Sequence, residues 1–350
     1  MPTPQSPQAS PNAQLPIVLD ATQLSCFRSC PQKFYLEFVL GLRPPGLSVD
    51  LHAGSCFASA IEETYRQIYL NKKSLGEALL LSHAKFLLEW GNFEIPPYKH
   101  TAKTLDRMWE AVVGDGTPEG IGYFQEYPPL SDHIKPYIAS DGHPTLEYTF
   151  AIPLEPCTDE KAWEMLKKDP NTPLKMFPSH PSGQPFLYCG RFDMLGEKDG
   201  RPLPVDQKTT AASPSQDWAR KWQLRSQFIG YVWALQQCNL DVDSVCVRGI
   251  SIMREKIRHM EHIQTYSQVV IDRWYEQLRR DVWRIRQAWD EQYFDFNLAE
   301  SCTSYGNCVF MDGCTARDPE EWLGEMQVRR WDPLKKNPVA SPNPALESAA

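Results

Sequence analysis

Two acidic residues and a lysine lie near the ends of two short apolar runs, in an order that could hold a divalent metal ion. Asp193 closes the segment 190–193, and Asp206 and Lys208 follow in the segment 205–210. Two adjacent strands would bring both acids together, and carboxylates in that arrangement hold Mg²⁺ or Mn²⁺ with open water positions. Such ions activate water and stabilise a phosphodiester leaving group. Lys208 lies two residues after Asp206 and so points to the same strand face, where it could orient water or neutralise charge. The alternative is a solvated hairpin with surface charges.

A second polar pair follows on an expected helix over residues 216–238. Gln227 and Tyr231 are spaced i and i+4, so their side chains face the same way. A functional interpretation places both near an active-site phosphate or base. The alternative is that Tyr231 covers the core with its hydroxyl outward and Gln227 is a surface residue.

Three cysteines follow the last expected helix in the pattern Cys302-x5-Cys308-x5-Cys314, within a segment rich in Gly, Asn, Ser and Asp. Tetrahedral sulfur ligation needs a fourth ligand, which Cys30 or Cys26 supplies if the chain ends meet. Thiolates bind both iron–sulfur clusters and zinc, and unligated thiols are the third alternative. The other cysteines fit small buried apolar residues: Cys56, Cys157, Cys189, Cys238 and Cys246.

The elements that must position these residues alternate between helix and strand along the chain. Apolar periodicity predicts helices over residues 54–70, 75–90, 102–112, 216–238 and 269–289 and strands over 145–153, 186–195, 203–208 and 244–253. Ser74 and Glu77 form a capping-box pattern. The pattern predicts an α/β fold in one domain over 17–331, with a helical insert at about 70–135 and a proline-rich insert at 155–185. Residues 1–16 and 332–350 are expected to be disordered tails.

Composition narrows the class of protein. The 350 residues carry a net charge of −8, with 42% hydrophobic and 23% charged residues, as in a globular protein. We expect no membrane span and no secretory signal, and ten cysteines then indicate a reducing, cytoplasmic location. No Gly-Lys pair occurs, so a P-loop motor is excluded. Tryptophans interleaved with arginines over 218–289 would suit single-stranded DNA, although tryptophans at helical spacing are more often core residues.

Taken together, Asp193, Asp206-Gln207-Lys208 and Gln227-x-x-x-Tyr231 resemble the PD-(D/E)XK nuclease superfamily, in particular its RecB-like branch. The similarity extends to Leu24-Ser25, the block Cys30-Pro31-Gln32-Lys33-Phe34-Tyr35-Leu36, Gly41-Leu42 and Gly54-Ser55, and so spans residues 24–314. It implies a restriction-endonuclease-like core, a mixed sheet flanked by helices, with a helical N-terminal region. It also implies Mg²⁺ or Mn²⁺ held by Asp193, Asp206 and Gln207, and catalytic roles for Asp193, Asp206, Lys208, Gln227 and Tyr231.

One position departs from that branch. Its first motif reads Gly-x-x-x-His-x-x-Leu-Glu, whereas here Gly54 is followed by Ala58 at the histidine position and by Glu62 at the glutamate position. Glu62 could take over the missing coordination as a metal ligand, or the site could work with one ion fewer. The alternative is that Glu62 and Glu63 form a solvated pair on the helix surface.

The resemblance also bears on the cysteines. Members of the iron–sulfur subgroup, including the AddB type and the exonucleases of CRISPR adaptation, use one N-terminal and three C-terminal cysteines to bind a 4Fe-4S cluster. That implies Cys30, Cys302, Cys308 and Cys314 here, with zinc as the other occupant. The implied function is a metal-dependent DNA nuclease, expected to be an exonuclease of DNA repair, recombination or phage DNA processing. It would act on single strands or duplex ends, alone or with a separate helicase or recombinase. The rival is an inactive DNA-binding or assembly module.

Overall fold

The computed structural model describes residues 13–46, 48–97, 99–156, 164, 176–211, 215–298, 300–303, 307–317, 322 and 325–334. Most of the expected tails and of the proline-rich insert lie outside this part. Residues 13–16, expected in the N-terminal tail, are described, and there the main-chain N–H of Gln14 donates to Val39 O at 3.2 Å. Leu15 is buried. The described part of the chain therefore includes four residues of the expected N-terminal tail.

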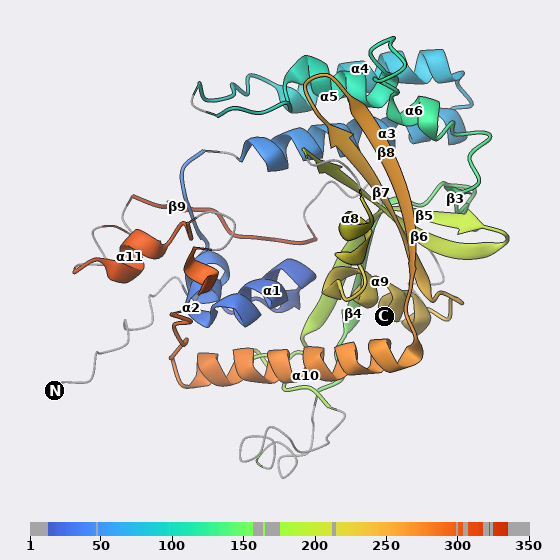
Figure 1. The fold of residues 1–350 in the computed structure, drawn as a ribbon. Coiled ribbons are helices and arrows are strands. Elements are labelled where there is room, and N and C mark those ends of the chain that lie inside the picture. Colours follow the sequence, from blue (N-terminus) through green and yellow to red (C-terminus); the bar gives the residue numbers. More distant parts are fainter. Residues whose placement is uncertain are drawn as a thin grey trace. The chain divides into compact units, whose positions relative to one another are not determined.

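The chain divides into two compact units. The first unit comprises Met1–Gly46, Ala151–Gly190 and Asp272–Lys336, and the second unit comprises Leu47–Phe150, Arg191–Ile271 and Asn337–Ala350. The sequence pattern indicated one domain over 17–331. Each unit is described separately below, and Figure 1 gives the element labels.

A mixed sheet of seven strands runs through the described residues and confirms the expected fold class. Its strand order is β1-β5-β6-β7-β8, and β3 and β4 also pair with β5. Within it β6 is parallel to β7, whereas β5 and β8 are antiparallel to their neighbours β6 and β7. The bounds are β1 Val18–Leu19, β3 Lys135–Pro136, β4 Leu146–Pro153, β5 Leu187–Lys198, β6 Arg201–Thr210, β7 Ser244–Ile252 and β8 Ile257–Thr265.

One face of the sheet in the second unit is covered by four helices, the last three of which lie within residues 70–135, where a helical insert is expected. These helices lie together in Figure 1: α3 Val49–Tyr69, α4 Leu75–Trp90, α5 Leu105–Val113 and α6 Tyr123–Glu126. Phe57 and Ile61 of α3 belong to the same buried cluster as Val205 of β6 and Ile250 of β7. The capping box of α4 is present, since Ser74 Oγ accepts from the Glu77 N–H at 3.3 Å and Glu77 Oε2 accepts from the Ser74 N–H at 3.0 Å.

The expected helix over 216–238 is two helices, α8 Gln216–Arg220 and α9 Ser226–Gln237. At the break, the Tyr266 hydroxyl donates to the Trp222 carbonyl at 2.6 Å and so engages an oxygen of the intervening turn. Trp218 and Trp222 pack edge to face at 5.1 Å between ring centres. Apolar periodicity continues through this turn because both tryptophans are buried, which hides the break in the sequence.

The first unit gathers the N-terminal helices with the C-terminal segment. Its elements are α1 Ala21–Ser29, α2 Pro31–Phe34, the π-helix η1 Tyr35–Val39, the β2–β9 pair Leu42–Arg43 and Gln327–Val328, η2 Glu300–Cys302 and α11 Met311–Thr315. The long helix α10 Gln268–Asp290 lies mainly in this unit. Phe34 packs on Phe27 and on Phe294, with ring centres 5.4 Å and 6.4 Å apart. This aromatic cluster fixes the segment after α10 against α1 and α2.

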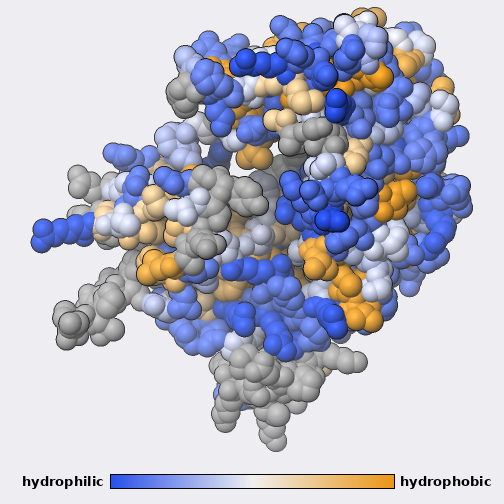
Figure 2. Space-filling model, viewed as in Figure 1, coloured by the Kyte–Doolittle hydropathy of each residue, from blue (hydrophilic) through white to orange (hydrophobic). Residues whose placement is uncertain are grey.

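The described helices include none that is both long and apolar enough to cross a membrane. On the face drawn in Figure 2 hydrophilic residues predominate and hydrophobic residues are scattered among them. Five tryptophans of the arginine-rich region are buried, which supports the core interpretation over stacking with DNA bases: Trp218, Trp222, Trp233, Trp274 and Trp283. The cysteines expected in the core are buried as well, at positions 56, 189, 238 and 246, whereas Cys157 lies outside the described residues.

Candidate active site

Strand β6 presents Asp206 and Lys208 on one face, as their spacing predicts. Lys208 Nζ lies 2.6 Å from Asp206 Oδ2. The Asp206 side chain is buried, with 2% exposed, whereas Lys208 keeps 33% exposed, so the pair is within reach of solvent. Gly249 is the register partner of Lys208 on β7. A Cβ on that glycine would lie 2.5 Å from the Trp218 ring, so glycine is needed for this ring to lie beside the pair.

Asp193 joins this pair where the β5–β6 ladder ends. The ladder runs from Lys198 opposite Arg201 to Met194 opposite Val205, and Asp193 and Asp206 come directly after that last pair. Asp193 Oδ2 accepts a hydrogen bond from the main-chain N–H of Gln207 at 2.6 Å. The two aspartates therefore lie close together on neighbouring strands, at the point where the pairing of β5 with β6 ends.

Helix α9 adds the expected glutamine and tyrosine. Gln227 Nε2 lies 3.4 Å from Asp206 Oδ1 and 2.7 Å from the Tyr231 hydroxyl. That hydroxyl donates in turn to the main-chain carbonyl of Arg191 on β5. Tyr231 is 3% exposed and packs edge-on against Phe192 at 5.0 Å between ring centres. The structure thus brings Gln227 and Tyr231 together with Asp206, and Tyr231 is both a core residue and a hydrogen-bonding partner of Gln227.

Gln207, expected among the metal ligands, has its side chain on the other face of β6. Its Nε2 donates to the Tyr123 hydroxyl at 3.0 Å. Alternation along the strand separates this side chain from Asp206 and Lys208. Gln207 could therefore bind a metal ion beside Asp206 and Lys208 only through its main-chain carbonyl oxygen.

Glu62 of α3 forms an ion pair within its own helix. Its carboxylate pairs with Arg66 one helical turn later, and Glu63 lies 3.2 Å from the same arginine. A Cβ on Gly54 of α3 would lie 3.6 Å from Thr209 Oγ1. Thr209 points to the opposite face of β6 from Asp206 and Lys208, so α3 packs on that opposite face. Ala58 lies on the stripe between Gly54 and Glu62. Glu62 as a metal ligand therefore stays a prediction.

The charges of Asp193, Asp206 and Lys208 make this site suited to a cation. Burial and the negative charge of Asp193 together raise the pKa of Asp206 to about 6, against the opposing effect of Lys208. Burial lowers the pKa of Lys208, but the carboxylates of Asp206 and Asp193 outweigh it and the net shift is upward. Two carboxylates thus share one ammonium, and a second positive charge would be favoured there. Their oxygen donors suit Mg²⁺ or Mn²⁺.

Arg225 also acts on this site, although its role was not anticipated from the sequence. It is the N-cap residue of α9, and its positive charge lowers the pKa of both Asp206 and Lys208. The signal available in the sequence was its position two residues before Gln227. Charge is therefore supplied to the site from α9 as well as from β6.

The expected cysteine ligands belong to the first unit, in segments that contact one another. Asn297 Nδ2 donates to the Ser29 carbonyl at 2.6 Å, and the Gln32 N–H donates to Asp295 O at 3.0 Å. Residues 295–297 therefore lie beside Cys30, which caps α2 with its sulfur 3.5 Å from the Lys33 nitrogen. On the C-terminal side the Cys308 N–H donates to the Cys302 carbonyl at 2.7 Å. The chain ends meet, as cluster ligation requires.

The four thiols are near enough for their charges to interact. Burial, together with the charges of Cys308, Cys30 and Cys302, raises the pKa of Cys314 to about 11. All four are free thiols in the structure. Across the part of the chain that the structure describes, however, no three His, Cys, Asp or Glu side chains are placed to hold a metal ion. The donor set is all sulfur, which fits an iron–sulfur cluster or zinc, and its assignment stays a prediction.

Comparison with known proteins identifies a relationship over most of the chain. Residues 19–315 match the family model described as the PD-(D/E)XK nuclease superfamily. No curated protein matches the chain. Among solved structures, that of SSO0001 aligns over 85% of this chain and 85% of its own, at 12% sequence identity and a TM-score of 0.29. A TM-score this low bears on neither fold nor function.

Proposed function

The chain belongs to the PD-(D/E)XK nuclease superfamily, and on that premise we propose that it hydrolyses DNA phosphodiester bonds with Mg²⁺ or Mn²⁺. The observation that carries the proposal is the ion pair of Asp206 and Lys208, 2.6 Å apart, on the strand next to Asp193, whose carboxylate accepts from the Gln207 N–H. The residues proposed to hold the ion are Asp193 and Asp206, with the main-chain carbonyl of Gln207. When bound, the ion supplies Lewis-acid charge at the scissile phosphate and acidifies a water molecule.

The protein side chains would do the rest of the chemistry by position and charge. Because the pKa of Lys208 is raised, its ammonium stays protonated. It would therefore orient the attacking water or neutralise charge on the phosphate rather than remove a proton. Gln227 donates to Asp206 and to Tyr231, so it would fix the carboxylate while the Tyr231 hydroxyl anchors the glutamine to β5. In the reaction, the water oxygen would form the new bond to phosphorus as its proton passes to solvent, and the bond to the leaving oxygen would break as that oxygen takes up a proton from solvent.

A nuclease assay tests this proposal. End-labelled linear and closed circular DNA, single- and double-stranded, would be incubated with the protein and Mn²⁺ or Mg²⁺. Asp206→Asn should lose cutting, whereas Asp217→Asn, which removes an exposed carboxylate paired with Arg220 at 3.4 Å, should cut as the parent does. A parent that binds DNA but cuts none of these substrates with either ion would contradict the proposal. That result would favour the inactive DNA-binding module.

The finer assignment within the superfamily is also a proposal. We assign exonuclease action of the RecB-like type, in repair, recombination or phage DNA processing, with a helicase or recombinase as a separate partner. The support is the ordered set of motifs from Leu24 to Cys314 in the sequence and the lack of a P-loop. An exonuclease would degrade linear substrates and spare circular ones. Free thiols at all the described cysteines accord with a reducing, cytoplasmic location.

For the first unit we propose a 4Fe-4S cluster held by Cys30, Cys302, Cys308 and Cys314, with zinc as the other candidate. The support is the interaction of the Cys314 thiol with the other three and the hydrogen bonds that hold residues 295–297 beside residues 29–32. Such a cluster would be structural, because it would tie the two ends of the first unit together. Anaerobic purification with iron, zinc and sulfide analysis distinguishes a cluster from zinc and from unligated thiols.

A further inference from the structure

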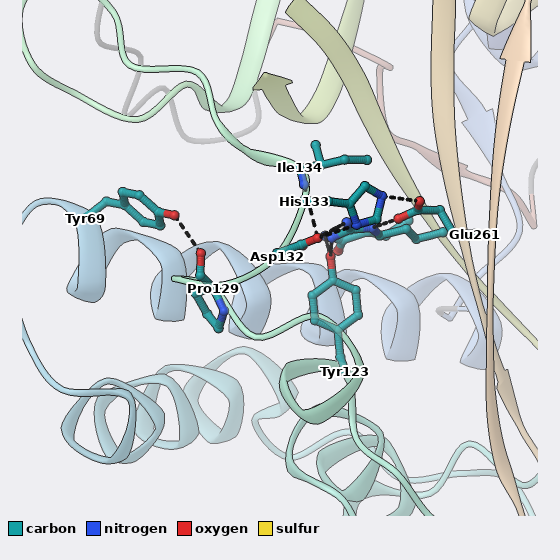
Figure 3. Close-up of polar contacts among 9 residues, drawn as sticks. Tyr69, Tyr123, Pro129, Asp132, His133, Ile134 and Glu261 are labelled. Atoms are coloured by element: carbon teal, nitrogen blue, oxygen red, sulfur yellow. Dashed lines mark hydrogen bonds and ion pairs between the residues drawn. The ribbon is translucent and has the colours of Figure 1, made fainter. Parts of the chain in front are cut away.

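On the face of the sheet opposite Asp206 and Lys208, the second unit has a buried arginine that contacts carboxylates and tyrosines. Arg248 of β7 is fully buried. Its Nη2 lies 2.8 Å from Asp132 Oδ2 and its Nε lies 3.0 Å from Glu261 Oε2. The ring of Tyr127 lies 3.9 Å from the guanidinium carbon. Figure 3 shows Asp132, Glu261 and the Tyr123 hydroxyl converging on one place. Two carboxylates and an aromatic ring thus hold the guanidinium in one orientation.

Tyr123 connects this cluster to the strand that carries the acids. Its hydroxyl lies 3.2 Å from Arg248 Nη1 and 3.0 Å from Gln207 Nε2, so one oxygen accepts from both side chains. Gln207 and Arg248 are register partners on the parallel strands β6 and β7, and their side chains lie on the same face of the sheet. The Tyr123 hydroxyl therefore joins the two strands at the level of Gln207.

The connection continues from Gln207 to both aspartates. The main-chain N–H of Gln207 holds Asp193 Oδ2 at 2.6 Å, and Gln207 is the residue between Asp206 and Lys208. A displacement of Gln207 would therefore change the separation of the two carboxylates. We infer that Tyr123 and Arg248 are positioning residues that act through Gln207 to hold Asp193 and Asp206 at the spacing a divalent cation needs. This inference rests on the proposed function.

A purely structural role is the competing explanation, because removing one partner of a buried ion pair destabilises a fold. Replacing Arg248 would not separate the two. Tyr123→Phe is the sharper variant, since it deletes only the shared hydroxyl. Tyr69→Phe is its matched control, because the Tyr69 hydroxyl donates to the Pro129 carbonyl at 2.7 Å, in the same part of the unit but apart from the Tyr123 hydroxyl (Figure 3).

The test measures Mn²⁺ binding to the full chain by titration calorimetry, alongside the Mn²⁺ concentration that gives half-maximal DNA cleavage. We expect Tyr123→Phe to weaken both about tenfold and to cut as fast as the parent at saturating Mn²⁺. Tyr69→Phe should match the parent in both measurements. Parent-like Mn²⁺ affinity in Tyr123→Phe, or equal weakening in the two variants, would overturn the inference.

The same experiment separates this inference from the function on which it rests. A parent that binds Mn²⁺ and cuts DNA, together with an unaffected Tyr123→Phe, rejects the positioning role alone. A parent that neither binds Mn²⁺ nor cuts DNA rejects the proposed function and the positioning role with it. Thermal unfolding of both variants identifies lost stability, and weakened Mn²⁺ binding without a fall in Tm supports positioning.

Discussion

At the scale of single residues, the ion pair of Asp206 and Lys208 is the feature on which the account depends. The types and spacing of Asp193, Asp206 and Lys208 predicted that their side chains lie close together. For Asp206 and Lys208 the reason is that side chains alternate along a strand, which is a strong local constraint. The same rule shows why Gln207 could not contribute its side chain there, since that side chain must lie on the other face. The bond from the Gln207 N–H to Asp193 was beyond prediction, because it depends on how two strands end.

Asp206 should make the metal-free protein more stable at acid pH than near neutral pH. Burial raises its folded pKa from an ordinary value near 3.8 to about 6, so the folded state binds the proton more tightly than the unfolded state does. Stability therefore falls as pH rises from about 4 to about 6, by about 3 kcal/mol. Asp206→Asn should lack this fall. Chemical denaturation in a chelator between pH 4 and 7 measures it, and parallel curves for parent and variant would contradict the burial argument.

Lys208 should contribute to the rate rather than to ion binding. Its ammonium pairs with Asp206 and remains charged, so Lys208→Met should slow single-turnover cleavage at saturating Mn²⁺ by about 10²- to 10³-fold. Mn²⁺ affinity should not fall, because a positive charge beside the ligands has been removed. Calorimetry and rapid-quench kinetics give the two quantities. A loss of Mn²⁺ affinity with an unchanged rate at saturating Mn²⁺ would show that Lys208 acts in ion binding and not in the chemical step.

At the scale of elements, the sequence located the long helical segments and the strands β4 to β7, but it missed the nine-residue strand β8 and did not fix every boundary. The periodicity of 216–238 could not reveal the break between α8 and α9, because Trp218 and Trp222 stay buried through the turn. The partner that engages the turn, Tyr266, is 44 residues away from Trp222. Tertiary hydrogen bonds of this kind override local pattern.

Strand β7 contains a buried charged residue whose partners the sequence did not reveal. Its residues from Val245 to Ile252 are all buried, and Arg248 is one of them. A single arginine within an otherwise apolar run was the available signal for a buried ion pair. Its acidic partners could not be identified from the sequence, because Asp132 is 116 residues away from it.

The turn between α8 and α9 should be held by Tyr266. Tyr266→Phe deletes the hydroxyl that donates to the Trp222 carbonyl. Because that carbonyl also accepts from the Arg225 N–H at 3.2 Å, the variant should lose about 0.5–1.5 kcal/mol of stability, the net contribution of one hydrogen bond. Urea denaturation checks this value, with Tyr69→Phe as a half-buried tyrosine control. Because α9 carries Gln227 and Tyr231, cleavage should fall together with stability. An unchanged urea midpoint would show that the turn does not depend on this bond.

At the scale of the whole molecule, the chain contains two compact units that carry different chemistry. The acid and lysine residues lie in the second unit, and the four cysteines lie in the first. The sequence anticipated that the chain ends meet, through its resemblance to a known family. It did not indicate the division into two units, because each unit is assembled from segments that are far apart along the chain.

The cysteine site should stabilise the first unit. Ligation by Cys30 and Cys314 would close a long loop, and closure entropy grows with loop length. Cys308→Ala should lose the iron and lower the Tm of anaerobically purified protein by about 6 °C or more, the equivalent of about 2–3 kcal/mol. Cys238→Ala, at a buried cysteine of the second unit, should keep its iron. Parent protein free of iron and sulfide would contradict the cluster, and one bound zinc per chain would replace it.

The central claim is that the site of Asp193, Asp206 and Lys208 hydrolyses DNA with a divalent ion. Cleavage in ¹⁸O-labelled water with Mn²⁺, followed by mass spectrometry of the products, tests it most directly. We predict one solvent oxygen in the new terminal phosphate for each bond cut by the parent, and no products from Asp206→Asn. Cutting by Asp206→Asn at the parental rate, or products without solvent oxygen, would contradict the account.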